Sequence, residues 1–406
     1  MTTTAGDTTV TDSDPMLFDP LQDGVPPDPY PLYDRLRRED PVHRSSTGRW
    51  LLTRYEDCWS VLSNPAMSTA QRQATGDSDE AQMLAAYLSN LMLFNDPPDH
   101  TRLRGLVNKA FTPRVIERLR PRITELVGEL LDVAAEAGSI DVIAELGRPL
   151  PVTVIAEMLG VPAEDQGTFR GWSEVLAHTV DPDMDAETAA RAAMAGLEFM
   201  AYFTAMAEER RQHPQDDLLS GLVAAEEDGD RLTADELVTN CILLLIAGHE
   251  TTTNLIGNGT LSLLRHPAEL SRWRADPSLA KTAVEELLRY DSPVHLTSRT
   301  AMQDVTVGET EVKAGEPLTL LLAAANRDPA EFAEPAVLDI GRLENRHLSF
   351  SSGPHFCLGA ALARIEGQIA LSALVSRFPR LELTLDELEW NPTTTLRGLR
   401  ALPLSV

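Results

Sequence analysis

Residues 350–359 read Phe-Ser-Ser-Gly-Pro-His-Phe-Cys-Leu-Gly, and the helical pattern Ala-Ala-Leu-Ala-Arg follows directly at 360–364. Two glycines, Gly353 and Gly359, flank a lone cysteine and allow the backbone to approach a flat group closely. Cys357 stands just before the expected helix start, where the positive end of the helix dipole favours a thiolate. The stretch therefore predicts an anionic sulfur ligand for a soft metal, the alternative being an ordinary buried cysteine.

The remaining cysteines and the apolar runs limit the classes of protein to which this chain can belong. Cys58 and Cys241 fall within apolar helical patterns, so we expect both to be buried hydrophobic side chains. Three scattered cysteines are too few for a disulfide framework, which favours a reducing cytoplasm. The longest apolar run, 241–248, is far shorter than the roughly 20 residues that span a bilayer. We expect a soluble cytoplasmic protein with no membrane partner and no signal peptide.

Length and composition predict one large domain. The chain has 406 residues, 43% hydrophobic and 24% charged, and no Gly/Ser-rich or Pro-rich linker interrupts residues 15–406. Residues 1–14 are rich in Thr, Ser and Asp and offer little apolar surface, so we expect them to be disordered. The net charge of −27 argues against nucleic acid as a partner.

Hydrophobic periodicity predicts a mainly α chain with small β-sheets, an α+β fold. Apolar residues recur at helical spacing over four segments, 114–137, 149–159, 186–211 and 360–377. Strand-like segments are short and comprise 50–53, 305–312, 317–322 and 381–383.

The longest predicted helix begins at Thr233-Ala-Asp-Glu236, which has the form of a capping box, and ends near Arg265 before His266-Pro267. Its middle, 247–254, reads Ala-Gly-His-Glu-Thr-Thr-Thr-Asn. Gly and Thr are unfavourable in the centre of a buried helix, because Gly costs about 1 kcal/mol relative to Ala. We therefore expect a functional break in the helical ladder here.

Residues 350–359 resemble the cysteine loop of the cytochrome P450 family, which reads Phe-x-x-Gly-x-His/Arg-x-Cys-x-Gly. All five defined positions match, and they are Phe350, Gly353, His355, Cys357 and Gly359, while Ser351 stands where many members have Gly. The resemblance extends from about Asp19 to the C-terminus with the motifs in the family's order. It implies the cytochrome P450 fold, with haem b bound in the loop that contains Phe350 and Gly359 and iron bound by Cys357.

The middle of the long helix resembles the family's oxygen-activation signature. By resemblance, Ala247 and Gly248 lie against the haem, Thr251 supplies the hydroxyl that supports activation of O2, and Glu250 relays protons towards it. This chemistry requires protons to reach the oxygen while bulk water is excluded.

Two further sets of charged residues match the family. Glu286-x-x-Arg289 resembles its Glu-x-x-Arg motif, and the resemblance implies a buried structural network completed by Arg342. The family binds the haem propionates through cationic donors from three places. Here those donors are His100 and Arg104, then Arg299, then His355.

The segments that line the family's pocket correspond to 83–94, 169–203, 243–251, 294–298 and 393–396, and they are chiefly apolar. We expect an apolar, natural-product-like substrate, with pocket candidates Met92, Leu93, Leu244, Val294 and Leu296. Asp181, Asp183, Asp185 and Glu187 fall where the entrance lid is expected. They indicate either attraction for a cationic ligand group or a solvated loop.

A basic stretch interrupts the acidic average. The segment from His100 to Arg122 contains seven Arg and Lys residues and one acidic residue, Glu117. The basic residues are Arg102, Arg104, Lys109, Arg114, Arg118, Arg120 and Arg122. By resemblance this surface receives an acidic ferredoxin, reduced by ferredoxin reductase, with Arg102 directed to docking because it faces away from Arg104. The predicted activity is hydroxylation or epoxidation with O2 by a monomeric enzyme. The alternatives are an inactive P450-like docking module and a peroxide-driven peroxygenase.

Overall fold

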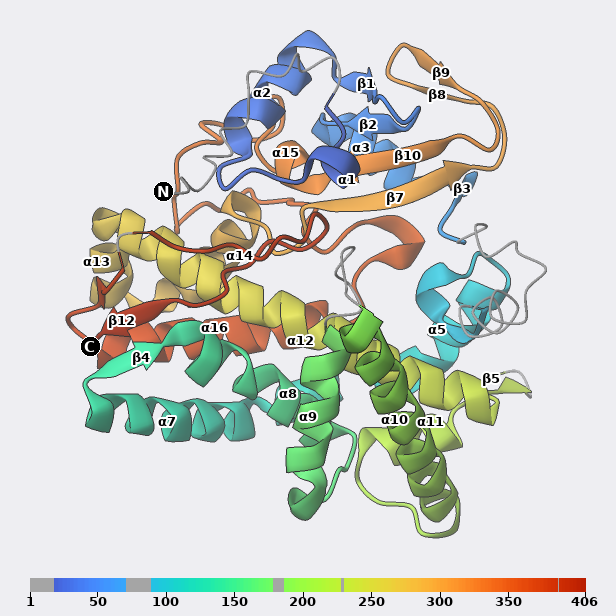
Figure 1. The fold of residues 1–406 in the computed structure, drawn as a ribbon, viewed down its shortest axis with the longest axis vertical. Coiled ribbons are helices and arrows are strands. Elements are labelled where there is room, and N and C mark those ends of the chain that lie inside the picture. The colour runs from blue at the N-terminus through green and yellow to red at the C-terminus, as the bar shows by residue number, and fades with distance from the viewer. Residues whose placement is uncertain (1–17, 71–88, 178–185, 228–229, 386) are drawn as a thin grey trace, which may run out of the picture.

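The computed structural model describes residues 18–70, 89–177, 186–227, 230–385 and 387–406. Residues 1–14, expected to be disordered, lie outside these ranges. The prediction of a mainly helical single domain with small sheets is confirmed. In Figure 1 a strand-rich part, formed by the N-terminal elements and the strands between residues 296 and 321, lies above the longest helix, and many helices lie below it.

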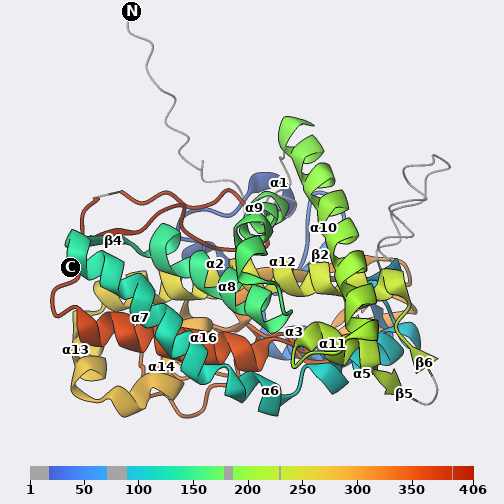
Figure 2. The same cartoon turned by 90° about the horizontal axis from the view of Figure 1, so that it is seen from below.

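The longest helix, α12 (Ala234–Arg265), runs through the middle of the molecule. Figure 2 shows α16 running roughly alongside it, α7 slanting across the same layer and α10 rising from that layer. The helices and the π-helical turn that pack with α12 or with one another in this layer are α7 (Arg120–Ala137), η3 (Val142–Gly147), α8 (Pro149–Met158), α9 (Gln166–Ala177), α10 (Ala186–Gln212), α13 (Pro267–Ala275), α14 (Ala280–Tyr290) and α16 (Ala360–Arg377).

The predicted boundaries of α12 are confirmed. Thr233 Oγ1 accepts from the Glu236 backbone N–H at 3.2 Å, and Glu236 Oε2 accepts from the Thr233 N–H at 2.8 Å, which completes the capping box. The expected break in the middle is wrong, since Ala234–Arg265 is one continuous α-helix. The Thr251 hydroxyl donates to the Ala247 carbonyl at 2.8 Å, so the polar side chain is accommodated without opening the helix.

The helix predicted over 114–137 is two helices, α6 (Pro113–Arg118) and α7 (Arg120–Ala137). Pro121 explains the division, because proline has no backbone N–H and is tolerated only in the first turn of a helix. The periodicity of apolar residues continues through the boundary, which is why the pattern alone joined them.

The main sheet has five strands in the order β1-β2-β10-β7-β3. Its strands are β1 (Val42–Arg44), β2 (Trp50–Leu52), β3 (Met67–Ser68), β7 (Leu296–Ala301) and β10 (Pro317–Leu321). β2 and β10 are parallel and the other pairs are antiparallel. The segment predicted as one strand at 305–312 is a hairpin of β8 (Val305–Val307) and β9 (Thr310–Val312), because Gly308 turns the chain at φ 58°.

Two smaller sheets complete the strands. One joins β11 (Glu382–Leu383), β12 (Pro403–Ser405) and β4 (Ser139–Asp141), and the other pairs β5 (Glu226–Glu227) with β6 (Asp230–Arg231). The remaining helices and helical turns are α1 (Pro20–Asp23), α2 (Tyr30–Glu39), α3 (Tyr55–Ser63), η2 (Met92–Phe94), α5 (Asp99–Ala110), η4 (Ala163–Asp165), α11 (Leu218–Ala224), η6 (Pro277–Leu279), α15 (Leu322–Ala325) and η7 (Gly353–His355).

The largest hydrophobic cluster surrounds α12, and two smaller ones lie against the main sheet. Cys58 and Cys241 are fully buried in two of these clusters, as predicted. Within the described residues, no helix combines the length and the apolar character needed to cross a membrane.

Candidate active site

Cys357 lies between the turn η7 and the start of α16. Its backbone N–H donates to the Phe350 carbonyl at 2.9 Å, which closes the loop. Gly353 has φ 67°, and a Cβ there would lie 2.4 Å from the Leu62 carbonyl oxygen of α3. Gly353 is therefore required for the loop to pack on α3. Gly359 has only an ordinary contact, 4.0 Å from a built Cβ to Cys357 Sγ.

The electrostatics of the Cys357 thiol differ from the expectation drawn from the helix dipole. Burial raises the pKa of this thiol, and it outweighs the backbone N–H groups of Gly359 and Ala360 and the charges of Arg104 and Arg364, which lower it. The start of α16 favours the thiolate, but it does not compensate for burial. A bound metal cation would, because a coordinating thiol is deprotonated.

Four nitrogen-bearing side chains gather beside this loop. His100 and Arg104 come from α5, Arg299 from β7 and His355 from η7. The imidazole rings of His100 and His355 lie with their centroids 3.9 Å apart, and Arg104 donates to the Phe356 carbonyl at 2.6 Å. Burial lowers the pKa of His355 to about 3, reinforced by His100, Arg299 and Arg104. Mutual repulsion of this kind indicates a site for an anionic group.

Arg299 is the most deeply buried arginine of this set. Its side chain is 6% exposed and donates to Thr297 Oγ1 at 3.2 Å and to the Ser298 carbonyl at 2.7 Å. Burial lowers its pKa to about 10. Among the ion pairs of the described residues, neither Arg299 nor Arg104 has a carboxylate within 4.0 Å. Both cations are left able to bind carboxylates from outside the protein.

The middle of α12 has an open face. Ala247 is exposed, and Gly248, Glu250 and Thr251 are half-buried, whereas the following turns of the helix are buried almost all round. On the closed side, a Cβ at Gly248 would lie 2.7 Å from Ile155 Cδ1 of α8. The glycine thus allows close packing of the two helices, and the acid and the hydroxyl of Glu250 and Thr251 lie beside the open face.

Glu286, Arg289 and Arg342 form one buried network. Glu286 and Arg289 are fully buried and joined by two hydrogen bonds of 2.8 Å, and Arg342 Nε donates to Glu286 Oε2 at 3.0 Å. Asn345 and the Asp339 backbone N–H also donate to the Glu286 carboxylate. The other guanidinium N–H groups of Arg289 donate to backbone carbonyls, so the Glu286 carboxylate and the Arg289 guanidinium are completely paired. Oδ1 of Asn345 is buried without a partner in the described residues.

Comparison with known proteins gives the family directly. The profile of the family described as Cytochrome P450 matches residues 44–400. The chain belongs to the cytochrome P450 family. It is similar to Cytochrome P450 monooxygenase PikC of Streptomyces venezuelae, at 44% identity over 93% of this chain and 91% of the relative. It is also similar to Vitamin D(3) 25-hydroxylase of Pseudonocardia autotrophica, at 45% identity over 93% and 94%.

Solved structures agree with these relatives. The crystal structure of P450BioI in complex with hexadec-9Z-enoic acid ligated Acyl Carrier Protein matches with a TM-score of 0.86 and 40% identity, over 93% of this chain and 97% of that one. The chain is thus a cytochrome P450 monooxygenase, and the recognition made from residues 350–359 is confirmed.

The residues present fit the haem that this family binds. A dianionic haem needs one axial ligand and two partners for its carboxylates. Cys357 offers a sulfur next to Arg104, and the cations of Arg104 and Arg299 have no carboxylate within 4.0 Å in the described part of the chain. The donor set of the site is therefore suited to the group.

Two acids near the site, the half-buried Glu285 and the buried Glu366, could not be singled out from the sequence. Glu285 accepts from Arg364 Nε at 2.7 Å and contacts His347 Nε2 at 3.1 Å; burial would raise its pKa, but these partners hold it at about 2. Glu366 of α16 is fully buried, with Thr252 Oγ1 at 3.5 Å, and burial raises its pKa to about 8. Spacing could not reveal these contacts, since the partners are 62, 79 and 114 residues apart.

The five pocket candidates do not lie in one cluster. Met92 and Leu244 belong to, or pack on, the large cluster around α12, and Val294 packs on a second cluster. Leu296 is buried with Tyr30 and Tyr33 in the third cluster, and Leu93 is exposed. Leu296 turns away because it lies in β7, where alternate side chains point to opposite faces of the sheet.

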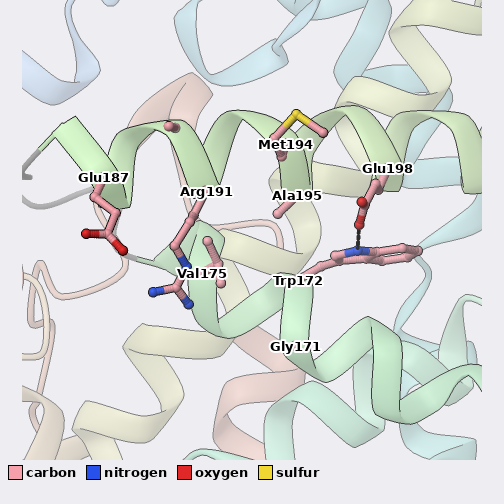
Figure 3. A pocket seen from close by; sticks show the side chains of 9 residues that line it. Gly171, Trp172, Val175, Glu187, Arg191, Met194, Ala195 and Glu198 are labelled. Atoms are coloured by element: carbon pink, nitrogen blue, oxygen red, sulfur yellow. Dashed lines mark hydrogen bonds between the residues drawn. The ribbon is translucent and has the colours of Figure 1, made fainter.

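A groove with a volume of about 430 Å³ lies between α9 and α10 (Figure 3), and of the expected lid acids it includes Glu187. Its floor is apolar, with Trp172, Val175 and Ala195, and Glu187 and Arg191 lie along it. Asp181, Asp183 and Asp185 lie outside the described residues.

The basic stretch 100–122 is largely paired within the chain. Arg102, expected to serve docking, forms ion pairs with Glu236 and Asp230, because the capping box of α12 places a carboxylate beside it. Arg118, Arg120 and Arg122 also have acidic partners within 4.0 Å. The positive surface is therefore smaller than the sequence suggested.

Proposed function

We propose that this cytochrome P450 inserts one oxygen atom of O2 into an apolar, natural-product-like small molecule by hydroxylation or epoxidation. The observation that carries the proposal is the group of four side chains beside Cys357, His100, Arg104, Arg299 and His355, whose arginines have no carboxylate partner within 4.0 Å in the described residues. Apolar ligands in the names of similar proteins, such as vitamin D(3) and hexadec-9Z-enoic acid, support the substrate class.

Each residue has a distinct role in this proposal. Haem b, when bound, supplies the iron at which O2 is activated and reduced by two electrons. Cys357 would hold the iron as a thiolate, and His100, Arg104, Arg299 and His355 would bind the propionates, while Phe350, Gly359, Ala247 and Gly248 would be the other haem-binding residues. Glu250 moves protons towards the Thr251 hydroxyl, which holds one at the open face of α12. Glu286, Arg289 and Arg342 maintain the Cys357 loop during haem incorporation.

A carbon monoxide difference spectrum of the reduced protein tests this function. We expect the long-wavelength Soret band of a thiolate-ligated carbonyl complex, and its loss in Cys357→His. The matched control is Cys241→Ala, which changes a buried cysteine of α12 and should keep the band. A protein that stays colourless after haem supplementation, or a Cys357→His variant with the same band, would refute the proposal.

Turnover experiments distinguish the proposed function from two alternatives. An inactive docking module would bind haem poorly and oxidise nothing, and a peroxygenase would work with hydrogen peroxide as well as with O2 and electrons. Glu250 and Thr251 on the open face favour the O2-dependent route, because that route needs delivered protons. Screening apolar ligands by the spin-state shift of the iron would then narrow the substrate.

The electron donor in this proposal is ferredoxin, itself reduced by ferredoxin reductase, and the enzyme acts as a cytoplasmic monomer. Of the basic residues between 100 and 122, Arg114 is exposed and pairs with no acid within 4.0 Å in the described chain. Electrostatic docking predicts that turnover with ferredoxin falls as ionic strength rises. Turnover that is independent of salt would exclude it.

A further inference from the structure

A buried hydrogen bond joins α9 to the middle of α12. Ser173 Oγ and His249 Nδ1 are 3.1 Å apart, and the two residues are 1% and 3% exposed. His249 Nε2 is buried and has no partner in the described residues, so the Ser173 hydroxyl is the ring's one hydrogen-bonding neighbour there. Burial, with Arg148, lowers the pKa of His249 to about 4, so the bond joins two neutral groups at physiological pH.

Aromatic side chains join α9 to α10. Phe169 of α9 packs on Phe199 and Phe203 of α10, with ring centroids 5.7 and 6.1 Å apart. Trp172 packs on Phe199 and Tyr202. Its Nε1 donates to Glu198 Oε2 at 2.8 Å, and Figure 3 shows this hydrogen bond. These contacts make α9 and α10 one packed unit. A displacement of this unit from α12 must break the bond between Ser173 and His249.

One turn further along α12, a second polar contact fixes the same face of the helix. Thr253 Oγ1 donates to the Gly147 carbonyl of η3 at 2.8 Å. Residues 249 and 253 share a face, whereas Thr251 lies about 200° around the helix from His249. Because both contacts resist rotation of α12 about its axis, they determine the direction in which Glu250 and Thr251 point.

We propose that Ser173 and His249 are positioning residues, a latch that holds the α9–α10 unit against α12 and keeps Glu250 and Thr251 directed to the open face. This role rests on the proposed oxygenation, in which those two residues handle protons. Opening of the unit and loss of that direction are then one event, because the latch residue His249 directly precedes Glu250.

Hydrogen–deuterium exchange of the haem-loaded protein tests the latch. In Ser173→Ala we expect the amides of α9 to exchange about fivefold faster, since a buried hydrogen bond is lost and its partner is left unsatisfied. His249→Phe should have a similar effect, and the double variant should exchange no faster than the single ones, because both remove the same bond. The dissociation rate of bound 4-phenylimidazole should be about fivefold higher in Ser173→Ala than in the wild type. Stopped-flow measurement of the Soret shift gives this rate.

The matched control is Thr253→Val, which removes a buried hydroxyl that contacts the Gly147 carbonyl of η3 at 2.8 Å and the His249 carbonyl of its own helix at 3.1 Å. In the described residues this hydroxyl forms no hydrogen bond with α9, and its loss leaves the Ser173 and His249 side chains in place. Its α9 amides should exchange at the wild-type rate even if its overall stability falls as much as that of Ser173→Ala. Should His249→Phe fail to fold, Ser173→Ala still decides the question, because it removes only one oxygen atom.

Three outcomes overturn the latch: unchanged α9 exchange in Ser173→Ala, additive effects in the double variant, or an equal increase throughout the molecule. The α9 exchange does not depend on oxygenation chemistry. A protein that lacks the thiolate-type carbonyl band but shows faster α9 exchange in Ser173→Ala would refute the proposed function and retain the contact between the helices. Normal spectra with unchanged exchange would refute the latch alone.

Discussion

Two groups of charged side chains in this cytochrome P450, each containing one buried arginine, differ in how completely the protein itself pairs them. The Glu286 carboxylate receives hydrogen bonds from Arg289, Arg342, Asn345 and the Asp339 backbone. Arg104 and Arg299, in contrast, donate only to carbonyl and hydroxyl oxygens in the described residues. The polypeptide itself supplies the charge partners of the first group. The arginines of the second group gain a carboxylate partner only when an anionic ligand binds.

The difference separates residues that maintain the fold from residues that bind a ligand. Removing one member of a completely paired network leaves an unpaired buried charge, which destabilises the folded chain with or without a ligand. Removing one member of the incomplete group removes a repulsive charge from the ligand-free chain and weakens ligand binding. Measurements of the unfolding free energy and of the rate of haem release therefore distinguish the two groups.

The largest effect is expected for Glu286→Gln. It leaves Arg289 and Arg342 buried without a counter-charge, and we expect a loss of about 3–5 kcal/mol of unfolding free energy. Urea unfolding of the haem-free and haem-loaded protein measures it. The control Glu311→Gln, in an exposed pair with Lys313, should change stability by less than about 0.5 kcal/mol. A loss below about 1 kcal/mol for Glu286→Gln would contradict the role of the network.

Glu366 tests an intermediate case, a buried acid whose one polar contact is Thr252 in the described residues. Its pKa is raised to about 8, so the unfolded chain ionises this group at lower pH than the folded chain does. The stabilising contribution is complete below about pH 4.5 and is lost as the pH rises to about 8. Glu366→Gln should therefore gain stability relative to wild type across this window, measured by urea unfolding at several pH values. Parallel pH profiles for the two proteins would show that Glu366 ionises normally.

Arg299→Met tests the second group, in which the arginines have no carboxylate partner in the described residues. We expect the unfolding free energy of the haem-free protein to change by less than about 1 kcal/mol, because no ion pair is lost and burial disfavours the charge. Haem transfer to apomyoglobin should become at least about tenfold faster, since a charged hydrogen bond to a carboxylate is lost. Arg400→Met, at an exposed pair, is the control. A large loss of stability in the haem-free Arg299→Met protein would contradict this assignment.

The smallest effect concerns Ser351, an unsatisfied polar residue of the Cys357 loop. It has φ 61°, and its hydroxyl is buried without a partner in the described chain. Ser351→Gly should raise the unfolding free energy by about 0.5–1 kcal/mol, because glycine adopts this conformation without strain and removes the unpaired hydroxyl. Thermal unfolding measures it, with Glu334→Gly as control, since Glu334 has φ 46° but is not in the loop. A lower melting temperature for Ser351→Gly would show that the hydroxyl has a partner in solution.

The sequence predicted features that depend on neighbours in the chain. The capping box of α12 and the Cys357 loop before α16 depend on residues within a few positions of one another. Prediction from the sequence failed for features that depend on contacts between segments far apart in the chain. The pairing of Arg102 with Glu236 spans 134 positions, and that of Ser173 with His249 spans 76. The pattern of apolar residues also hid the division at Pro121 and the direction of Leu296.

Polar contacts fix both ends of α12. The capping box and the ion pair between Glu236 and Arg102 hold the start, and His266, bonded to the Ser262 carbonyl at 2.7 Å, holds the end. Between its ends the helix packs on η3, α8, α9 and α16, and the face around Ala247 is the one that stays open. Side chains there can change in size to suit a new guest molecule while the anchorage that keeps the enzyme folded stays as it is.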